Sequence, residues 1–228
     1  MSFVHVRHEI PSLLKETQED GQRVYLTPDG KRYPSVTTVI ADHNKKGIDQ
    51  WRKRVGDKNA DRISKIATDR GDMVHEALEA LLMNYSTLDY MKKMTPYAKA
   101  VFVNMKKEVV QRISEVHGIE QTLYSHKIRL AGTADCVAVY DGKLSIVDFK
   151  TSLKLKKKAW VYGYFMQLTA YAFMFQELTG LEIEQGVILI GVDNCNFAQT
   201  FRLPRSEFTP YFKDLLSYRD KYVERIAA

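Results

Sequence analysis

Cysteine is scarce in this chain, which has only Cys136 and Cys195 among its 228 residues. Two distant cysteines give neither a disulfide framework nor the spacing of a zinc site, and they exclude a four-cysteine iron–sulfur cluster. Long apolar runs are also missing, since none reaches the roughly 18 residues that a membrane span needs. The N-terminus lacks a signal-peptide core and soon reaches acidic Glu16, Glu19 and Asp20, unlike a transit peptide. We therefore expect a cytoplasmic protein.

Repeats, low-complexity tracts and recognisable linkers are absent as well, so we expect residues 1–228 to form one domain. With 45% hydrophobic and 27% charged residues, the composition supports a sizeable core and argues against disorder. The formal net charge of +6 leans mildly toward a polyanionic partner, although a slightly basic soluble protein would explain it equally well.

The apolar periodicity predicts an α/β fold, a single domain with a central mixed β-sheet flanked by α-helices. A hairpin turned at Pro28-Asp29-Gly30 is predicted over residues 22–40, its second arm leading into Pro34–Ile40. Thr95-Pro96 predicts the start of a helix that ends at Gly118, and Thr209-Pro210 predicts the start of the last helix. The remaining predicted elements are helices over 61–83 and 158–178, strands over 119–130, 183–192 and 197–203, and a central hairpin over 132–150.

The central hairpin carries the strongest functional signal. Asp141-Gly142 is typical of a two-residue hairpin loop, because both central positions need positive φ. The resulting register places Asp135 opposite Asp148, where two carboxylates about 5 Å apart repel unless a cation lies between them. Lys150 shares the face of Asp148, because strand side chains alternate with period two. Paired carboxylates with an ammonium indicate a metal-dependent phosphodiesterase.

Other candidate residues are weaker when taken alone. His75 lies at the edge of a helical apolar stripe, and a lone helical histidine is usually structural. Glu120 by itself is a charged residue at a strand end. Gln167 and Tyr171 share one face of a buried helix, where they either satisfy each other in the core or reach the site.

A basic stretch follows the hairpin, and its cations are interleaved with aromatic residues. A lysine run is most often a solvated loop, but beside a phosphodiesterase site this pattern favours a track for single-stranded nucleic acid. The residues concerned are Lys154, Lys156, Lys157, Lys158 and Trp160. Basic residues 45–54 around Trp51 form a weaker second candidate.

Six short segments, in order, resemble the PD-(D/E)xK nuclease superfamily, in particular the mitochondrial genome maintenance exonucleases and phage relatives of its RecB-like branch. They are Ser35-Val36-Thr37, Arg70-Gly71 through His75, Glu120, Gly132-Thr133-Ala134-Asp135, Asp148-Phe149-Lys150-Thr151, and Gln167 with Tyr171. Ala134 replaces the proline of the superfamily's name, which leaves the ligands intact. The four cysteines of the iron–sulfur members are missing.

The resemblance implies a restriction-endonuclease-like core over about residues 35–203 and a role for each matching residue. Asp135, Asp148 and the backbone carbonyl of Phe149 would bind Mg²⁺ or Mn²⁺, with His75 as an additional ligand. Glu120 would assist through water or a second metal. Lys150 would orient or help deprotonate the attacking water and offset transition-state charge.

For the matching residues outside the metal ligands, the resemblance implies supporting roles. Gln167 and Tyr171 would belong to the catalytic set, and Ser35, Thr37, Arg70 and Thr151 would contact DNA. Oxygen ligands suit magnesium, and a histidine ligand tilts the preference slightly toward manganese.

The sequence therefore predicts a metal-dependent DNA exonuclease that acts on single-stranded or end-frayed DNA in replication, recombination or repair, in a bacterial or phage-infected cell. Two alternatives remain open. One is a structure-specific endonuclease, which the same site would serve. The other is a catalytically idle nucleic-acid-binding subunit, which would have no need of the Asp135, Asp148 and Lys150 set.

Overall fold

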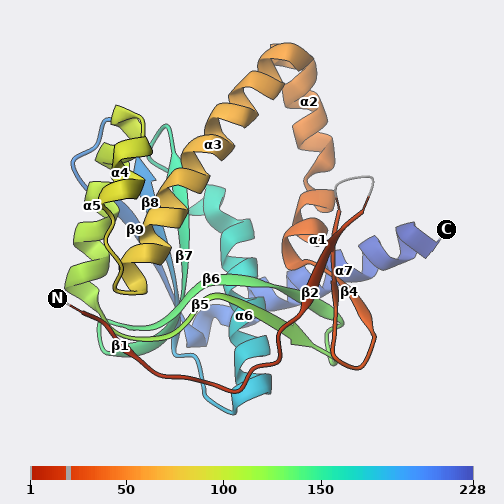
Figure 1. The fold of residues 1–228 in the computed structure, drawn as a ribbon. Helices are drawn as coiled ribbons and strands as arrows, with labels where there is room; N and C mark the ends of the chain where they lie inside the picture. Colours follow the sequence, from red (N-terminus) through yellow and green to blue (C-terminus); the bar gives the residue numbers. More distant parts are fainter. Residues whose placement is uncertain (1, 19–21, 228) are drawn as a thin grey trace.

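A six-stranded mixed sheet in the order β1-β5-β6-β7-β8-β9 forms the centre of the computed structural model, which describes residues 2–18 and 22–227 (Figure 1). Residues 1, 19–21 and 228, which include Glu19 and Asp20, lie outside this described part. The β1–β5 and β7–β8 pairs are parallel and the others antiparallel, which confirms the predicted mixed sheet. The strands are β1 (Val4–His5), β5 (Ile113–Ser125), β6 (Leu130–Tyr140), β7 (Lys143–Ser152), β8 (Gln185–Val192) and β9 (Ala198–Pro204).

Helices cover both faces of this sheet, and the alternation of side chains along β8 shows how the core divides. Val187 and Leu189 pack into the cluster formed with α3 (Asp57–Leu82) and α5 (Pro96–Arg112). Ile188 and Ile190 pack into the cluster formed with α6 (Tyr162–Thr179) and α7 (Phe208–Ala227). This strand is buried at every position, which agrees with the helices on both faces of the sheet. Within the described residues, no helix combines the length and apolarity of a membrane span.

The local signals for most of these elements are confirmed. The Thr95 hydroxyl accepts a hydrogen bond from the Ala98 N–H at 3.2 Å and caps α5, with Pro96 in its first turn. A 3₁₀ turn over Lys158–Val161 precedes α6, which ends at Gly180 in the left-handed conformation at φ 76°. The predicted end of the Thr95 helix at Gly118 is wrong, because β5 starts directly at Ile113, which pairs with Tyr140 of β6.

The N-terminal quarter departs most from the prediction. A small sheet of three antiparallel strands, β2 (Leu14–Thr17), β3 (Arg23–Leu26) and β4 (Arg32–Pro34), contains the predicted hairpin. Its second arm ends at Pro34, and the predicted extension to Ile40 is wrong. Ser35 instead caps α1 (Val36–His43) by accepting the Thr38 N–H at 2.9 Å. This cap starts a helix although the β-branched residues that follow it favour a strand.

Two further helices were not assigned from the sequence. They are α2 (Lys45–Val55) and the short α4 (Leu88–Lys93), and β1 and β2 were missed as well. The basic segment 45–54 thus lies on a helix, and α2 and α3 form a helical hairpin that rises above the sheet (Figure 1).

The register of the central hairpin is confirmed from Tyr140–Lys143 back to Cys136–Val147. Asp141 and Gly142 take φ values of 49° and 77°, as the two-residue loop requires. The ladder stops one pair short of Asp135 and Asp148. There the Asp135 carboxylate accepts the Phe149 N–H at 2.8 Å, so a side chain takes over the role of a ladder carbonyl.

Candidate active site

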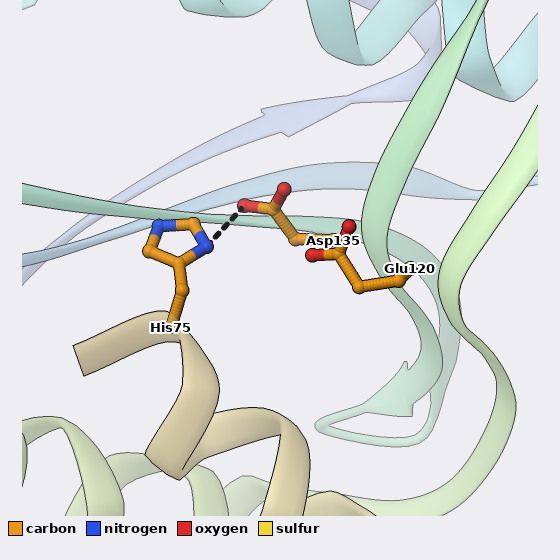
Figure 2. A group of neighbouring side chains, drawn as sticks. All are labelled: His75, Glu120 and Asp135. Atoms are coloured by element: carbon orange, nitrogen blue, oxygen red, sulfur yellow. Dashed lines mark ion pairs between the residues drawn. The ribbon is translucent and has the colours of Figure 1, made fainter. Parts of the chain in front are cut away.

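Three side chains from α3, β5 and β6 point toward one another beside the central hairpin (Figure 2). His75, Glu120 and Asp135 each offer a ligand atom, and these atoms all lie within 4.8 Å of one another. The His75 Nε2 lies 2.8 Å from the carbonyl oxygen of Phe149 and therefore donates to it. In the neutral ring Nδ1 is then free of a proton, and it lies 3.8 Å from the Asp135 Oδ2.

Glu120 reaches this group through an unusual backbone conformation. Its φ is 45°, a left-handed value that costs a non-glycine residue about 1–3 kcal/mol and often marks a functional position. The flanking pairs Ile119–Cys136 and Gln121–Ala134 place Glu120 opposite Asp135. Desolvation raises the pKa of the Glu120 carboxyl, and the charge of Asp135 adds to this shift while Lys15 opposes it. A cation between the two carboxylates would relieve their repulsion.

Asp148 and Lys150 form an ion pair with 2.6 Å between Oδ1 and Nζ, which places them on one side as predicted. Asp148 is 1% exposed. Burial raises its pKa to about 6, although the Lys150 ammonium acts in the opposite direction. Burial favours a lower pKa for Lys150, but the charges of Asp148 and Asp135 outweigh it and raise that pKa. Each charge of the pair thus favours the ionised form of the other.

The second carboxylate oxygen of Asp148 tests whether the site fits a metal ion. Oδ2 is buried and has no hydrogen-bond partner among the described residues. A buried carboxylate oxygen without a donor is costly, and a bound cation would satisfy it. The donors gathered here are carboxylate oxygens, the Phe149 carbonyl and one imidazole, a set that fits a hard divalent ion such as Mg²⁺ or Mn²⁺.

An active-site cleft of about 530 Å³ is lined by part of this group, and the buried Asp148 is not among its lining residues. His75, Glu120, Asp135 and Lys150 line it, and from α6 Gln167 and Tyr171 do so as well. The sequence analysis missed several lining residues. Asp72, Glu76 and Glu79 share the His75 face of α3 at helical spacing, which the pattern could have revealed. Lys15, Arg23 and Tyr25 come from the small sheet, and no local signal indicates that they reach the site.

Tyr171 stands over the hairpin because Gly132 leaves room for it. The Gln167 amide donates to the Tyr171 hydroxyl at 3.5 Å, and burial raises the pKa of that hydroxyl well above its ordinary value. A Cβ on Gly132 would lie 2.7 Å from Tyr171 ring and hydroxyl atoms. The first residue of the Gly132–Asp135 segment must therefore be glycine, because Tyr171 approaches it so closely.

Replacing Gly132 by Ala should therefore destabilise the protein by about 1–3 kcal/mol, because the buried Tyr171 ring must move. Gly71→Ala is the matched control, since its nearest neighbour atom would be an ordinary 3.9 Å away and alanine favours a helix. Urea unfolding of both variants measures the difference. Equal stability of the two variants would contradict the proposed contact.

A second groove of about 450 Å³ shares Thr37, Lys150 and Gln167 with the active-site cleft. Trp160 and Tyr164 line it, and α1 and α2 provide its other wall. The Lys150 ammonium lies 5.1 Å from the centre of the Tyr164 ring. The groove therefore continues from the candidate metal site toward exposed aromatic surface.

The residues predicted to contact nucleic acid are not all gathered there. Thr37 lines both hollows, whereas Ser35 is buried and serves as the cap of α1. Arg70 is 8% exposed and pairs with Asp193 at 2.8 Å, so its guanidinium faces the β8–β9 turn. Thr151 is half-buried and lines neither hollow.

The lysine run lies on an exposed loop beyond the second groove. The backbone of Lys156 exchanges two 2.8 Å hydrogen bonds with the Gln199 amide, which fixes the loop against β9. Lys157 lies 5.6 Å from the centre of the Trp160 ring, and Lys158 pairs with Glu207 at 3.6 Å. Neither hollow is lined by Lys154, Lys156, Lys157 or Lys158. Trp160 alone links this segment to the groove.

If His75 is a metal ligand, His75→Ala should weaken Mn²⁺ binding by roughly 10- to 100-fold. The metal-free melting temperature should fall only slightly, because the variant loses one partly exposed hydrogen bond worth about 1 kcal/mol. Calorimetric titration and thermal melts in a chelator measure the two effects. A large metal-free destabilisation with unchanged metal affinity would instead identify a structural histidine.

Comparison with known proteins agrees with this geometry. The PD-(D/E)XK nuclease superfamily matches residues 45–227. The chain is similar to mitochondrial genome maintenance exonuclease 1 of Homo sapiens, with 24% identity over 205 residues that cover 84% of this chain and 58% of that protein. The Mus musculus protein of the same name is 23% identical over 204 residues, covering 84% and 59%. That of Xenopus tropicalis is 28% identical over 131 residues, covering 54% and 37%. The chain thus spans less than two thirds of each relative.

Proposed function

The chain belongs to the PD-(D/E)XK nuclease superfamily, and on this premise we propose that it is a Mg²⁺- or Mn²⁺-dependent DNA exonuclease. Its substrate would be single-stranded or end-frayed DNA in replication, recombination or repair. The observation that carries the proposal is the meeting of His75, Glu120 and Asp135 ligand atoms within 4.8 Å, in the cleft that Lys150 also lines. The names of the relatives support the exonuclease assignment.

In the proposed mechanism, Asp135, the free Asp148 oxygen and the Phe149 carbonyl would hold the metal, with His75 as the nitrogen ligand. The bound ion would polarise the scissile phosphate and activate water. The His75 hydrogen bond to the Phe149 carbonyl orients two of these ligands at once. Glu120 would hold a water molecule or a second ion opposite Asp135. Lys150, fixed by Asp148, would orient the attacking water and offset charge on the phosphoryl oxygens.

Time courses on end-labelled linear and on circular single-stranded DNA, with Mg²⁺ and with a chelator, test the proposal. An exonuclease degrades the linear strand in Mg²⁺, spares the circle and is silent in the chelator. Cutting of the circle would favour the structure-specific endonuclease. Binding without cleavage of either substrate would favour the idle binding subunit.

The second groove makes Trp160 a stacking candidate. Trp160 is 61% exposed and lies at the end of a hollow that begins at Lys150. Trp160→Ala should weaken single-strand binding by about 1–3 kcal/mol if a base stacks on it. Lys156, Lys157 and Lys158 changed together to Gln should flatten the salt dependence if they follow phosphates, by about 0.7 in slope for each contact.

Fluorescence anisotropy with a labelled single strand at several salt concentrations measures both variants. If the triple lysine variant keeps the wild-type affinity and slope, the track does not use this loop. Basic residues 45–54 around Trp51 on α2 would then be the better candidates, and Trp51→Ala is the corresponding comparison.

A further inference from the structure

The small sheet brings two cations to the active-site cleft from the side opposite the acidic face of α3. Lys15 and Arg23 line the cleft together with Tyr25. Lys15 is the cross-strand partner of Tyr25, and Arg23 precedes Tyr25 by two residues, so the three side chains share one face of the sheet. In Figure 1, β2 lies to the right of α3 and apart from it.

These two cations differ from their neighbours in having no carboxylate partner among the described residues. Among residues 2–18 and 22–227, no ion pair includes the side chain of Lys15 or Arg23, although both line a cleft that contains five carboxylates. On the same sheet, Arg32 pairs with Glu16 at 3.2 Å, and Lys31 in the adjoining turn pairs with Asp29 at 2.9 Å. The positive charge of Lys15 nevertheless acts on Glu120, whose pKa it lowers against the prevailing upward shift.

The small sheet is also fixed to the strand that carries the metal ligand. Tyr25 is 1% exposed, and its hydroxyl lies 2.9 Å from the Thr133 hydroxyl, two residues before Asp135. The end of the small sheet bridges to the same strand through Ser35 and Ala131. The strands that carry Lys15 and Arg23 are therefore attached to the strand that carries Asp135.

We propose that Lys15 and Arg23 form a phosphate-binding wall that holds the DNA strand beside the metal site, an inference that rests on the proposed function. One phosphate would lie in the cleft beside Asp135, and neighbouring phosphates of the same strand would contact the two cations. Arginine and lysine both bind phosphate oxygens strongly, and Arg23 offers the bidentate geometry. The wall compensates for the acidic face of α3, which by itself repels a polyanion.

Lys15→Gln/Arg23→Gln in an Asp148→Asn background tests the proposal, because the DNA then stays intact during the measurement. Anisotropy titrations of an end-labelled single-stranded oligonucleotide over a range of KCl give affinity and salt slope. We expect binding to weaken roughly tenfold or more, and the slope to fall by about 1.4, or about 0.7 for each lost contact. Each single variant should show about half of the change in slope.

Lys31→Gln/Arg32→Gln is the matched control, since it removes the same charge from the same region outside the cleft. An unchanged slope in the Lys15/Arg23 variant, or an equal fall in the control, overturns the proposal. If the double variant fails to fold, the two single variants decide. Cleavage by the wild-type protein is tested separately. If the wild-type protein cleaves DNA but the Lys15/Arg23 variant keeps an unchanged slope, only the phosphate-binding wall is overturned. If the slope falls in the variant but the wild-type protein does not cleave, the proposed nuclease function is overturned.

Discussion

Asp148→Asn is expected to reduce cleavage by roughly 100- to 1,000-fold or more, because in the proposed mechanism it removes an oxygen that would hold the metal. The orphaned, buried Asp148 Oδ2 is the physical reason for choosing this residue. DNA affinity should stay near the wild-type value or rise, since one negative charge leaves the path of the phosphates. Turnover on end-labelled linear DNA and anisotropy titrations measure the two effects.

Two opposing terms affect the stability of this variant. The substitution relieves repulsion between Asp148 and Asp135, but it also removes the 2.6 Å ion pair that neutralises Lys150. We therefore expect a cooperative unfolding transition at a lower melting temperature. Asp141→Asn, at the closed end of the same hairpin, is the matched control, because asparagine tolerates its φ of 49° and only surface pairs are lost. Wild-type cleavage by Asp148→Asn at saturating Mg²⁺ would refute the site assignment.

Lys150→Met is expected to lower the turnover rate by about 100-fold or more, because the variant loses the cation. Methionine is chosen because it keeps the apolar stem beside Tyr164. Metal affinity should change less than about tenfold, since two effects oppose each other. Loss of the ammonium removes repulsion of the metal, and it also makes the Asp148 carboxyl harder to ionise. Single-turnover kinetics and calorimetric metal titration separate the chemical step from binding.

The same variant leaves Asp148 buried without its cation. Breaking a buried ion pair costs at most about 3–5 kcal/mol, and less here because 23% of the Lys150 side chain stays exposed. Added metal should restore part of the lost stability, whereas the cleavage defect should remain. Lys154→Met, on the exposed loop outside the cleft, is the control. Lost metal binding with nearly normal turnover would assign Lys150 a structural role instead.

The register of the central hairpin could be predicted because turn chemistry is local. Asp141-Gly142 accepts positive φ at both positions, and from that point each pair follows by counting. The same reasoning placed Asp148 and Lys150 on one side, where the ion pair joins them. Caps and apolar periodicity likewise predicted α5, α6 and the α/β order, because each depends on residues a few positions apart.

The candidate site itself joins segments that are far apart in the chain. His75 reaches Asp135 only because α3 packs on the sheet. Glu120 reaches it only because its own backbone is left-handed, which no sequence pattern indicates. Tertiary packing also gives Arg70, which the resemblance places at the DNA, an ion pair with Asp193 that no local pattern indicates.

The N-terminal segment shows most clearly the difference between what local sequence predicts and what tertiary packing decides. Its Pro28-Asp29-Gly30 turn predicted a hairpin, but nothing within the segment indicates that Lys15 and Arg23 face the active-site cleft. That outcome depends on the Tyr25–Thr133 contact between residues 108 positions apart. The sequence by itself thus determined the elements with clear turn, cap or periodicity signals and the hairpin chemistry, whose causes are short-range. Only the tertiary structure decided which side chains share the cleft, because that depends on how distant surfaces pack.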